Sequence, residues 1–333
     1  MAETDIAKVS VVVPTFNRLA QLRRTLEALA QQVDVDVPVE VVVVDDGSTD
    51  RTPEWLVSPD VPVQVVSVSQ QNGGPAAARN WGIQNATGDL IIFLDDDVVP
   101  ATDLIATHLG EHAAGDGDLV VIGPMRTPDS RLSPWVRWEQ KQLDKQYDAM
   151  LNGLWEATPR QFFTGNASVE RRHLAVAGGF DTSFRRAEDV ELGHRLADAG
   201  LKFTFVAEAV VLHYAERPFT SWRAAAGQYG RNDVIFGREL GREDLLRQFC
   251  AEFHYRHPLI RLTTSITLRS RVARRALVPV VAAATKLLCR TGPTALTDAA
   301  LSALYNLEYY HGMADQLGGG RELLRRFEAE RPT

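Results

Sequence analysis

The chain of 333 residues is 45% hydrophobic and 24% charged, a balance typical of a globular protein with a substantial core and not of a disordered chain or a disulfide scaffold. Its net charge of −7 argues against general nucleic-acid binding, and no apolar run reaches the ~20 residues that a membrane-spanning helix needs. Two cysteines cannot form a disulfide framework, and the first ten residues lack the apolar centre of a signal peptide, so the expected compartment is a reducing cytosol.

The first hundred residues alternate between apolar runs and helix-like segments. The runs are nearly continuous in Val, Ile and Leu, as in strands that are buried on both faces of a sheet. Strands are predicted at 9–13, 39–44, 63–68 and 90–94, and helices at 19–30 and 75–86. This alternation predicts the α/β class, with a mostly parallel sheet covered by helices on both faces and a ligand crevice beyond the carboxyl ends of the strands.

The remainder of the chain is more mixed. Residues 100–160 are less regular, whereas 188–201 has the pattern of a helix and 203–212 that of a strand. Helices are predicted to dominate from residue 221 onward. The expected domains are an α/β domain over 1–220, with halves at 8–100 and 101–220, and a helical region over 221–333.

Three consecutive acids follow the strand predicted at 90–94. Asp95, Asp96 and Asp97 would repel one another unless solvent or a cation compensated them. Hard cations such as Mg²⁺ and Mn²⁺ take oxygen ligands and commonly combine one or two carboxylates with substrate phosphates. The alternative is an acidic turn that caps the next helix. A phosphatase of the haloacid dehalogenase type is disfavoured because its Asp-x-Asp-x-Thr pattern is missing.

Two further polar clusters are expected at the same sheet edge. Asp45 and Asp46 follow the second strand, where a carboxylate can bond a ribose hydroxyl or a base; a helix-capping turn is the alternative. Gly73 begins a small-residue helix that lets a backbone approach a ligand closely and whose N-terminus favours phosphate. Arg79 could reach a base or phosphate, although a surface salt bridge is the simpler interpretation. The segment is not a P-loop, because the Gly-Lys-Ser/Thr ending is missing.

Seven segments in a fixed order and spacing resemble family 2 of the inverting glycosyltransferases, which have the GT-A fold and use nucleotide-diphospho-sugars. The donor-side segments are Val-Val-Val-Pro-Thr-Phe-Asn-Arg (11–18), Val-Asp-Asp-Gly-Ser-Thr-Asp (44–50), Asn-Gly-Gly-Pro-Ala-Ala-Ala-Arg-Asn-Trp-Gly (72–82) and Phe-Leu-Asp-Asp-Asp (93–97). The acceptor-side segments are Thr-Gly-Asn-Ala-Ser (164–168), Gly-Gly-Phe-Asp (178–181) and Glu-Asp-Val-Glu-Leu (188–192). The resemblance covers roughly residues 8–215.

The resemblance implies a role for each matching residue. Asp97 would bind Mn²⁺ or Mg²⁺ on the donor diphosphate, with His213 as a further metal or diphosphate contact. Asp189 would be the general base, next to Glu188. Gly165 and Asn166 would lie on the acceptor side. The donor would contact Pro14, Thr15, Phe16, Asn17, Arg18, Asp45, Asp46, Gly73, Arg79, Asp95 and Asp96.

The chemistry of sugar transfer explains these residue types. Departure of a nucleoside diphosphate builds negative charge that a divalent cation stabilises. A carboxylate such as Asp189, with its pKa raised by burial or by Glu188, can take the proton of the attacking hydroxyl. One displacement with one base inverts the anomeric centre, so no covalent sugar–enzyme intermediate is needed. The alternatives are a helix whose first turn is acidic and, for His213, a hydrogen-bonded histidine at a strand end.

The acceptor is less well defined by the sequence. Trp135, Trp138 and Trp155 lie in the irregular segment, where aromatic rings suit sugars but packing is the commoner use of tryptophan. The Gln-x-x-Arg-Trp signature of processive polysaccharide synthases is missing, which favours transfer of a single sugar. UDP is the default nucleotide by family frequency, with GDP and dTDP open, and the oligomeric state is also open.

Residues 254–290 contain eight basic residues and no Asp or Glu. Because this segment contributes +8 to a total of −7, the rest of the chain carries about −15. Basic residues flanking an apolar segment suit peripheral contact with an anionic membrane, which would favour a lipid-linked or cell-envelope glycan as acceptor. The alternative is a helix that packs on the catalytic domain and pairs with its acids.

Two other functions remain open at this point. A sugar-phosphate nucleotidyltransferase uses a related sheet but carries a glycine-rich, basic loop after the first strand, where this chain has Pro-Thr-Phe-Asn. A non-catalytic nucleotide-sugar or glycan-binding module would not need both Asp97 and Asp189. Both are therefore less favoured than a glycosyltransferase.

Overall fold

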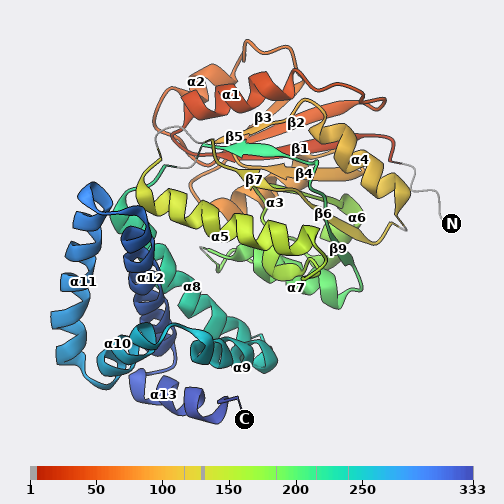
Figure 1. The fold of residues 1–333 in the computed structure, drawn as a ribbon. Helices are drawn as coiled ribbons and strands as arrows, with labels where there is room; N and C mark the ends of the chain where they lie inside the picture. The colour runs from red at the N-terminus through yellow and green to blue at the C-terminus, as the bar shows by residue number, and fades with distance from the viewer. Residues whose placement is uncertain are drawn as a thin grey trace. The chain divides into compact units, whose positions relative to one another are not determined.

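The computed structural model describes residues 6–115, 117–128, 132–184, 186–214, 216–238 and 240–332 (Figure 1). The described residues form two compact units. Those of 1–130 and 140–215 form the α/β unit, and those of 131–139 and 216–333 form the helical unit. One boundary between the units falls inside the long helix α5 (Pro134–Leu151).

The α/β unit is built on a seven-stranded sheet with the order β3-β2-β1-β4-β8-β6-β9. Only β8 is antiparallel to its neighbours β4 and β6, so the sheet is mostly parallel. A second sheet has the order β5-β10-β7. The strands are β1 (Val9–Thr15), β2 (Val39–Asp45), β3 (Val65–Ser69), β4 (Leu90–Leu94), β5 (Val98–Pro100), β6 (Leu119–Ile122), β7 (Met125–Arg126), β8 (Asn166–Glu170), β9 (Lys202–Phe205) and β10 (Val211–His213).

Helices cover both faces of the large sheet, which explains the continuous apolar strands. Because successive side chains of a strand point to opposite faces, Val11 and Val13 of β1 join a core with α1 and α4, whereas Val12 joins a core with α3, α6 and α7. This arrangement confirms the predicted fold class. The helices are α1 (Leu19–Leu29), α2 (Thr52–Leu56), α3 (Pro75–Asn85), α4 (Leu104–Ala114), α6 (Arg171–Ala177) and α7 (Glu188–Asp198), with a 3₁₀ turn at Pro159–Gln161.

Two sequence-based expectations for the α/β unit were wrong. The strand predicted at 203–212 is two strands in different sheets, because the chain turns where Ala209 N–H bonds the carbonyl of Val206 and Val210 N–H that of Glu208. The segment 100–160 was expected to be irregular but contains α4 and α5. Its Trp and Pro residues lowered the expectation of helix there, although Pro134 is tolerated because it is the first residue of α5.

The helical unit has two apolar clusters and a close helix pair. The helices beyond α5 are α8 (Phe219–Arg238), α9 (Glu243–Glu252), α10 (Pro258–Arg269), α11 (Arg271–Thr291), α12 (Thr294–Gln316) and α13 (Gly320–Ala329), with a 3₁₀ turn at Phe253–Tyr255. One cluster gathers Phe249, Tyr310 and Phe327, and the other gathers Trp222 and Leu304. Across the described ranges, no helix is both long enough and apolar enough to cross a membrane.

Helices α8 and α12 touch through glycine. A Cβ atom at Gly230 would overlap the carbonyl oxygen of Tyr309, and one at Gly312 would overlap that of Gly227. Gly230→Ala should therefore lower the free energy of unfolding by about 2 kcal/mol, although helix propensity alone predicts a gain of up to ~1 kcal/mol.

Gly110→Ala in α4 is the matched control for this prediction. Nothing lies within 4 Å of a Cβ atom at Gly110, so only the gain in helix propensity should appear. Thermal unfolding followed by circular dichroism measures both variants. A Gly230→Ala protein as stable as the Gly110→Ala protein would contradict the close approach of the two helices.

Candidate active site

The carboxyl ends of β1, β2 and β4 bring the donor-side segments together. Thr15 pairs in register with Asp45, and Thr15 Oγ1 donates a hydrogen bond of 2.7 Å to Asp96 Oδ2. Arg18 Nη1 lies 3.0 Å from Asp96 Oδ1 and 2.8 Å from Asp97 Oδ2. The predicted convergence of the residues after β1, β2 and β4 is therefore present in the structure.

The three acids at the end of β4 have different surroundings. Burial raises the pKa of Asp96 to about 6, and the neighbouring acids add to this, although Arg18 and Thr15 oppose it. Burial also acts on Asp97, but hydrogen bonding and charge from His213 and Arg18 outweigh it and lower the pKa of Asp97. The side chain of Asp95 is the most exposed of the three, at 32%. Asp97 is thus held more firmly as a carboxylate than Asp96.

The small sheet brings His213 to Asp97. His213 pairs with Val98 across β10 and β5, and its Nε2 lies 3.3 Å from Asp97 Oδ1. A carboxylate oxygen and an imidazole nitrogen form a donor set that Mn²⁺ accepts. The described residues contain no group of three or more His, Cys, Asp and Glu side chains that could hold a metal ion. The pair therefore fits an ion that takes its other ligands from a diphosphate and water.

Arg79 is placed differently from the expectation. Its side chain is buried in α3 and does not reach out to a base or phosphate. Nη1 lies 2.9 Å from Glu188 Oε1, Nη2 lies 2.8 Å from Asp95 Oδ1, and the guanidinium lies over the ring of Phe180. Both terminal nitrogens are thus used by carboxylates, and Arg79 joins the acids of β4 to the acids of α7. The surface salt bridge considered from the sequence is in fact a buried one.

Glu188 and Asp189 lie in the first turn of α7, where the acidic segment begins after Ala187. Ala187 has a φ of 59°, a left-handed conformation that turns the chain into the helix. Asp189 is half-buried. Burial, with added repulsion from Glu188, raises the pKa of Asp189 to about 7, although Arg79 opposes the shift. A carboxylate with a pKa near the working pH suits general-base catalysis.

The turns after β1 and β2 hold each other in place. Asn17 has a φ of 55°, and its Oδ1 accepts hydrogen bonds from the backbone N–H groups of Thr49 and Asp50. Its own N–H donates to Ser48 Oγ. The side-chain oxygen of Asn17 is therefore used within the protein, whereas the neighbouring Phe16 is 44% exposed.

Asp45 and Asp46 are also used within the protein. Asp45 Oδ1 accepts from Ser48 N–H at 2.9 Å. Asp46 accepts from the Gln70 side chain and from the N–H groups of Gly73 and Gly74, at 2.6 to 2.9 Å. Both carboxylates are buried. The expectation that Asp46 contacts the base does not fit this arrangement, because its oxygens hold the glycine turn in front of α3.

Gly165 lies at the site, but Asn166 does not face it. A Cβ atom at Gly165 would lie 2.9 Å from Asp95 Oδ2. Asn166 is fully buried; its Nδ2 donates to the carbonyls of Ala209 and Pro124, and its Oδ1 lies 3.2 Å from His108 Nε2. The expected acceptor contact of Asn166 does not fit this arrangement, because its side chain is buried and bonded within the protein.

The three tryptophans proposed for the acceptor differ in burial and in their contacts. Trp135 and Trp138 belong to the helical unit. Trp138 is 7% exposed and packs edge-on against Trp222, and Trp135 Nε1 donates to the carbonyl of Arg217. The packing alternative fits both residues, and the buried Trp138 leaves little surface for a sugar contact. Trp155 is 52% exposed.

Thr25 was not identified from the sequence as a residue that supports the site. Its Oγ1 lies 2.9 Å and 2.6 Å from the carbonyl oxygens of Asp96 and Val98, within donating distance of either, and so holds the acidic turn against α1. The available signal was a polar residue within the buried stripe formed by Leu22, Leu26 and Leu29.

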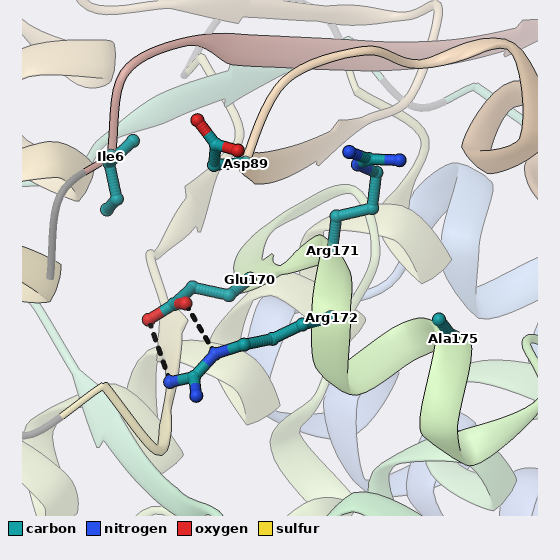
Figure 2. A pocket seen from close by; sticks show the side chains of 6 residues that line it. All are labelled: Ile6, Asp89, Glu170, Arg171, Arg172 and Ala175. Atoms are coloured by element: carbon teal, nitrogen blue, oxygen red, sulfur yellow. Dashed lines mark hydrogen bonds and ion pairs between the residues drawn. The ribbon is translucent and has the colours of Figure 1, made fainter.

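A separate pocket of about 340 Å³ lies at the opposite edge of the large sheet (Figure 2). Asp89 immediately precedes β4 and Ile6 lies three residues before β1, so both are at the ends of these strands opposite to the acidic turn. Figure 2 shows Glu170 facing Arg172, with 2.7 Å between Oε2 and Nε. The pocket is therefore distinct from the acidic site.

A mostly parallel sheet with acids at its strand ends, together with an acidic helix joined to them, defines the class of GT-A nucleotide-sugar transferases. Comparison with known families agrees with this class. Residues 10–187 match the family described as "Glycosyl transferase family 2". The chain belongs to this family, as its motifs implied.

The relatives give the extent of the similarity. The chain is 30% identical over 255 residues to the uncharacterized glycosyltransferase YfnE of Bacillus subtilis, covering 62% of this chain and 64% of the relative. It is 32% identical over 240 residues to the validoxylamine A glucosyltransferase of Streptomyces hygroscopicus subsp. jinggangensis, covering 62% of this chain and 56% of the relative. The matched region thus spans less than two thirds of the length of each of these relatives.

Solved structures share the fold. The mannosyltransferase PcManGT of Pyrobaculum calidifontis, in complex with GDP-Man and Mn²⁺, has a TM-score of 0.59 at 23% identity and covers 91% of this chain and 87% of its own. TarS 1-349 of S. aureus, in complex with UDP, has a TM-score of 0.54 at 17% identity and covers 93% and 92%. At these identities the likeness establishes the GT-A fold.

Proposed function

We propose that the protein is an inverting glycosyltransferase that moves one sugar from a nucleoside-diphospho-sugar to an acceptor hydroxyl. The observation that carries this proposal is the buried Arg79 bridge, which holds Asp95 and Glu188 on one guanidinium. Asp95 belongs to the acidic turn proposed to bind the donor, and Glu188 is next to the proposed base Asp189. The side chain of Arg79 therefore links the two parts of the proposed active site.

The donor would bind along the carboxyl ends of β1 and β4. The exposed ring of Phe16, in the turn after β1, would pack against the nucleobase. Asp95 would accept a hydrogen bond from a ribose hydroxyl. Asp97 and His213 would hold Mn²⁺ or Mg²⁺, which when bound neutralises charge on the departing diphosphate. GDP-Man with Mn²⁺ in PcManGT and UDP in TarS support this type of ligand. UDP remains the default nucleotide, with GDP and dTDP as alternatives.

Asp189 would act on the acceptor. Its oxygen accepts the proton as the hydroxyl attacks the anomeric carbon from the face opposite the leaving group. Glu188 is held by Arg79, so it stays in place beside Asp189 and keeps the pKa of that base raised. One displacement then gives inversion, with no protein nucleophile required.

The acceptor is proposed to be a glycan or a lipid-linked alcohol of the cell envelope, reached from the cytoplasmic side of the membrane. Of the three tryptophans considered from the sequence, Trp155 is the exposed one and would contact a sugar. Transfer of a single unit is favoured because the processive signature is missing from the sequence.

A panel of nucleotide sugars tests the proposal. With Mn²⁺ present, one donor should raise the thermal midpoint and be hydrolysed slowly, and EDTA should remove both effects. Pyrophosphate release from a nucleoside triphosphate and a sugar phosphate would instead favour a nucleotidyltransferase. Stabilisation by a donor without any turnover, even with added acceptor alcohols, would favour a binding module.

A further inference from the structure

Helix α11 has an unpartnered apolar face. Its inner side packs through Val278, Ala282 and Thr285, while α10 and α12 lie beside it (Figure 1). On the opposite side Val272, Val280 and Leu287 are 77%, 63% and 61% exposed. With Ala276 and Ala283, which are also exposed and share this side at helical spacing, they form the outer face of α11.

Positive charge lies along one edge of this outer face. Arg275 and Lys286 come three residues after Val272 and Ala283, which places them at that edge, and both are exposed. No acid occurs between residues 254 and 290. Within the described part of the chain, Arg256 and Arg274 are the members of the segment that form ion pairs, with Glu252 and Asp315.

A pocket of about 510 Å³ extends from Val278 on the inner side of α11 to Arg275 and Pro279 at the edge of the outer face. It is lined by Arg271, Arg274, Arg275, Val278, Pro279 and Asp315. The carboxylate of Asp315 accepts two hydrogen bonds from Arg274, at 2.6 Å and 3.0 Å. Three guanidinium groups thus line a pocket with one carboxylate, which pairs with Arg274, and the positive charge that remains suits a phosphate group.

We propose that the outer face of α11 docks on an anionic phospholipid surface and that the three-arginine pocket receives a headgroup phosphate. An apolar stripe flanked by basic residues is the pattern of a helix that lies in a membrane interface. The rest of the chain carries about −15, so attraction to anionic lipid comes from this segment. This goes beyond the proposed glycosyl transfer and does not depend on it.

A second copy of the chain fits the face less well. An isologous contact would place two such faces against each other, and each carries basic residues without an acid to pair with them. Like charges brought together at an interface are unfavourable. Charge complementarity therefore selects anionic lipid over a dimer.

Sedimentation with vesicles tests the charged part of the site. At about 0.15 M salt the full chain should bind phosphatidylcholine vesicles that contain one third phosphatidylglycerol, and should not bind phosphatidylcholine alone. Each basic residue near an anionic surface contributes about fivefold to binding. Arg271→Gln with Arg275→Gln should therefore weaken binding about 25-fold.

The charge control removes two arginines elsewhere in the helical unit. Arg247→Gln with Arg321→Gln changes the net charge equally at two exposed residues that form no ion pair among the described residues. It should leave vesicle binding within about twofold. Equal loss in both double variants would overturn the proposal, as would failure of the unaltered chain to bind the anionic vesicles.

The apolar part is tested by Val280→Ser with Leu287→Ser, which should weaken binding about tenfold or more. Val57→Ser with Val176→Ser, at residues 86% and 82% exposed in the α/β unit, is its control. Circular dichroism checks that each variant is folded, and donor hydrolysis is measured separately in solution. A dimer that Val280→Ser with Leu287→Ser dissociates would overturn the lipid assignment in favour of a second copy.

Discussion

Asp189→Asn is expected to reduce turnover at least 100-fold while leaving donor affinity within about threefold of the unaltered protein. The amide has nearly the same shape as the carboxylate but cannot accept a proton from the acceptor hydroxyl. The bridge between Arg79, Glu188 and Asp95 does not involve the side chain of Asp189. Donor binding should therefore survive when proton transfer is lost.

Steady-state kinetics with a saturating donor measures this change, and thermal stabilisation by the donor measures affinity. Asp103→Asn, which neutralises an exposed acid of the same unit, is the control and should leave both quantities unchanged. Turnover of Asp189→Asn within threefold of the unaltered protein would remove Asp189 as the base. A parallel loss of donor affinity would instead place Asp189 on the donor side.

The raised pKa of Asp189 gives this prediction a pH signature. Because a base must be unprotonated, turnover of the unaltered protein should fall as the pH drops below about 7, and Asp189→Asn should lose this limb from its residual rate. The unfolded chain has an ordinary aspartate pKa, so folding takes up a proton between about pH 4 and pH 7, and stability falls as pH rises through that window. At pH 8 the Asn variant should melt no lower than the unaltered protein.

The large sheet could be predicted because each of its strands has a recognisable pattern in the local sequence. Strands buried on both faces are apolar without interruption, and the acids that follow β4 are conspicuous directly after Leu94. Parallel strands bring their carboxyl ends to one edge, so the grouping of Thr15, Asp45 and Asp96 followed from order alone. The strand at 203–212 failed because its two halves join different sheets, which the apolar pattern does not encode.

The partners of the polar residues could not be predicted in the same way. Arg79 and Glu188 are 109 residues apart in the chain, and nothing local shows that an arginine in a small-residue helix is buried between two acids. Asn166 and Asp46 likewise have side chains used by distant backbone groups. A motif thus locates a site more reliably than it assigns a ligand contact to each of its residues.

Asp97→Ala is expected to remove the metal dependence of donor binding. Asp97 has the lowered pKa of the acidic turn and is the carboxylate paired with His213, so it is the oxygen ligand available to a hard cation throughout the neutral range. Without it the proposed pair of metal ligands loses its carboxylate. Because loss of a residue that merely orients a metal ligand costs 10- to 100-fold in metal affinity, we expect loss of the ligand to cost at least about 100-fold.

Isothermal titration of donor with Mn²⁺ and with EDTA separates this effect from a change in fold. The unaltered protein should bind donor much more tightly with Mn²⁺, whereas Asp97→Ala should bind it equally weakly under both conditions. Asp96 keeps its hydrogen bond from Thr15 and its contact with Arg18 in this variant, so the turn should remain folded, and Asp103→Asn should respond to Mn²⁺ like the unaltered protein. A full response to Mn²⁺ in Asp97→Ala would show that the ion is held elsewhere, because a site that needs the carboxylate of Asp97 cannot keep its metal affinity when that carboxylate is gone.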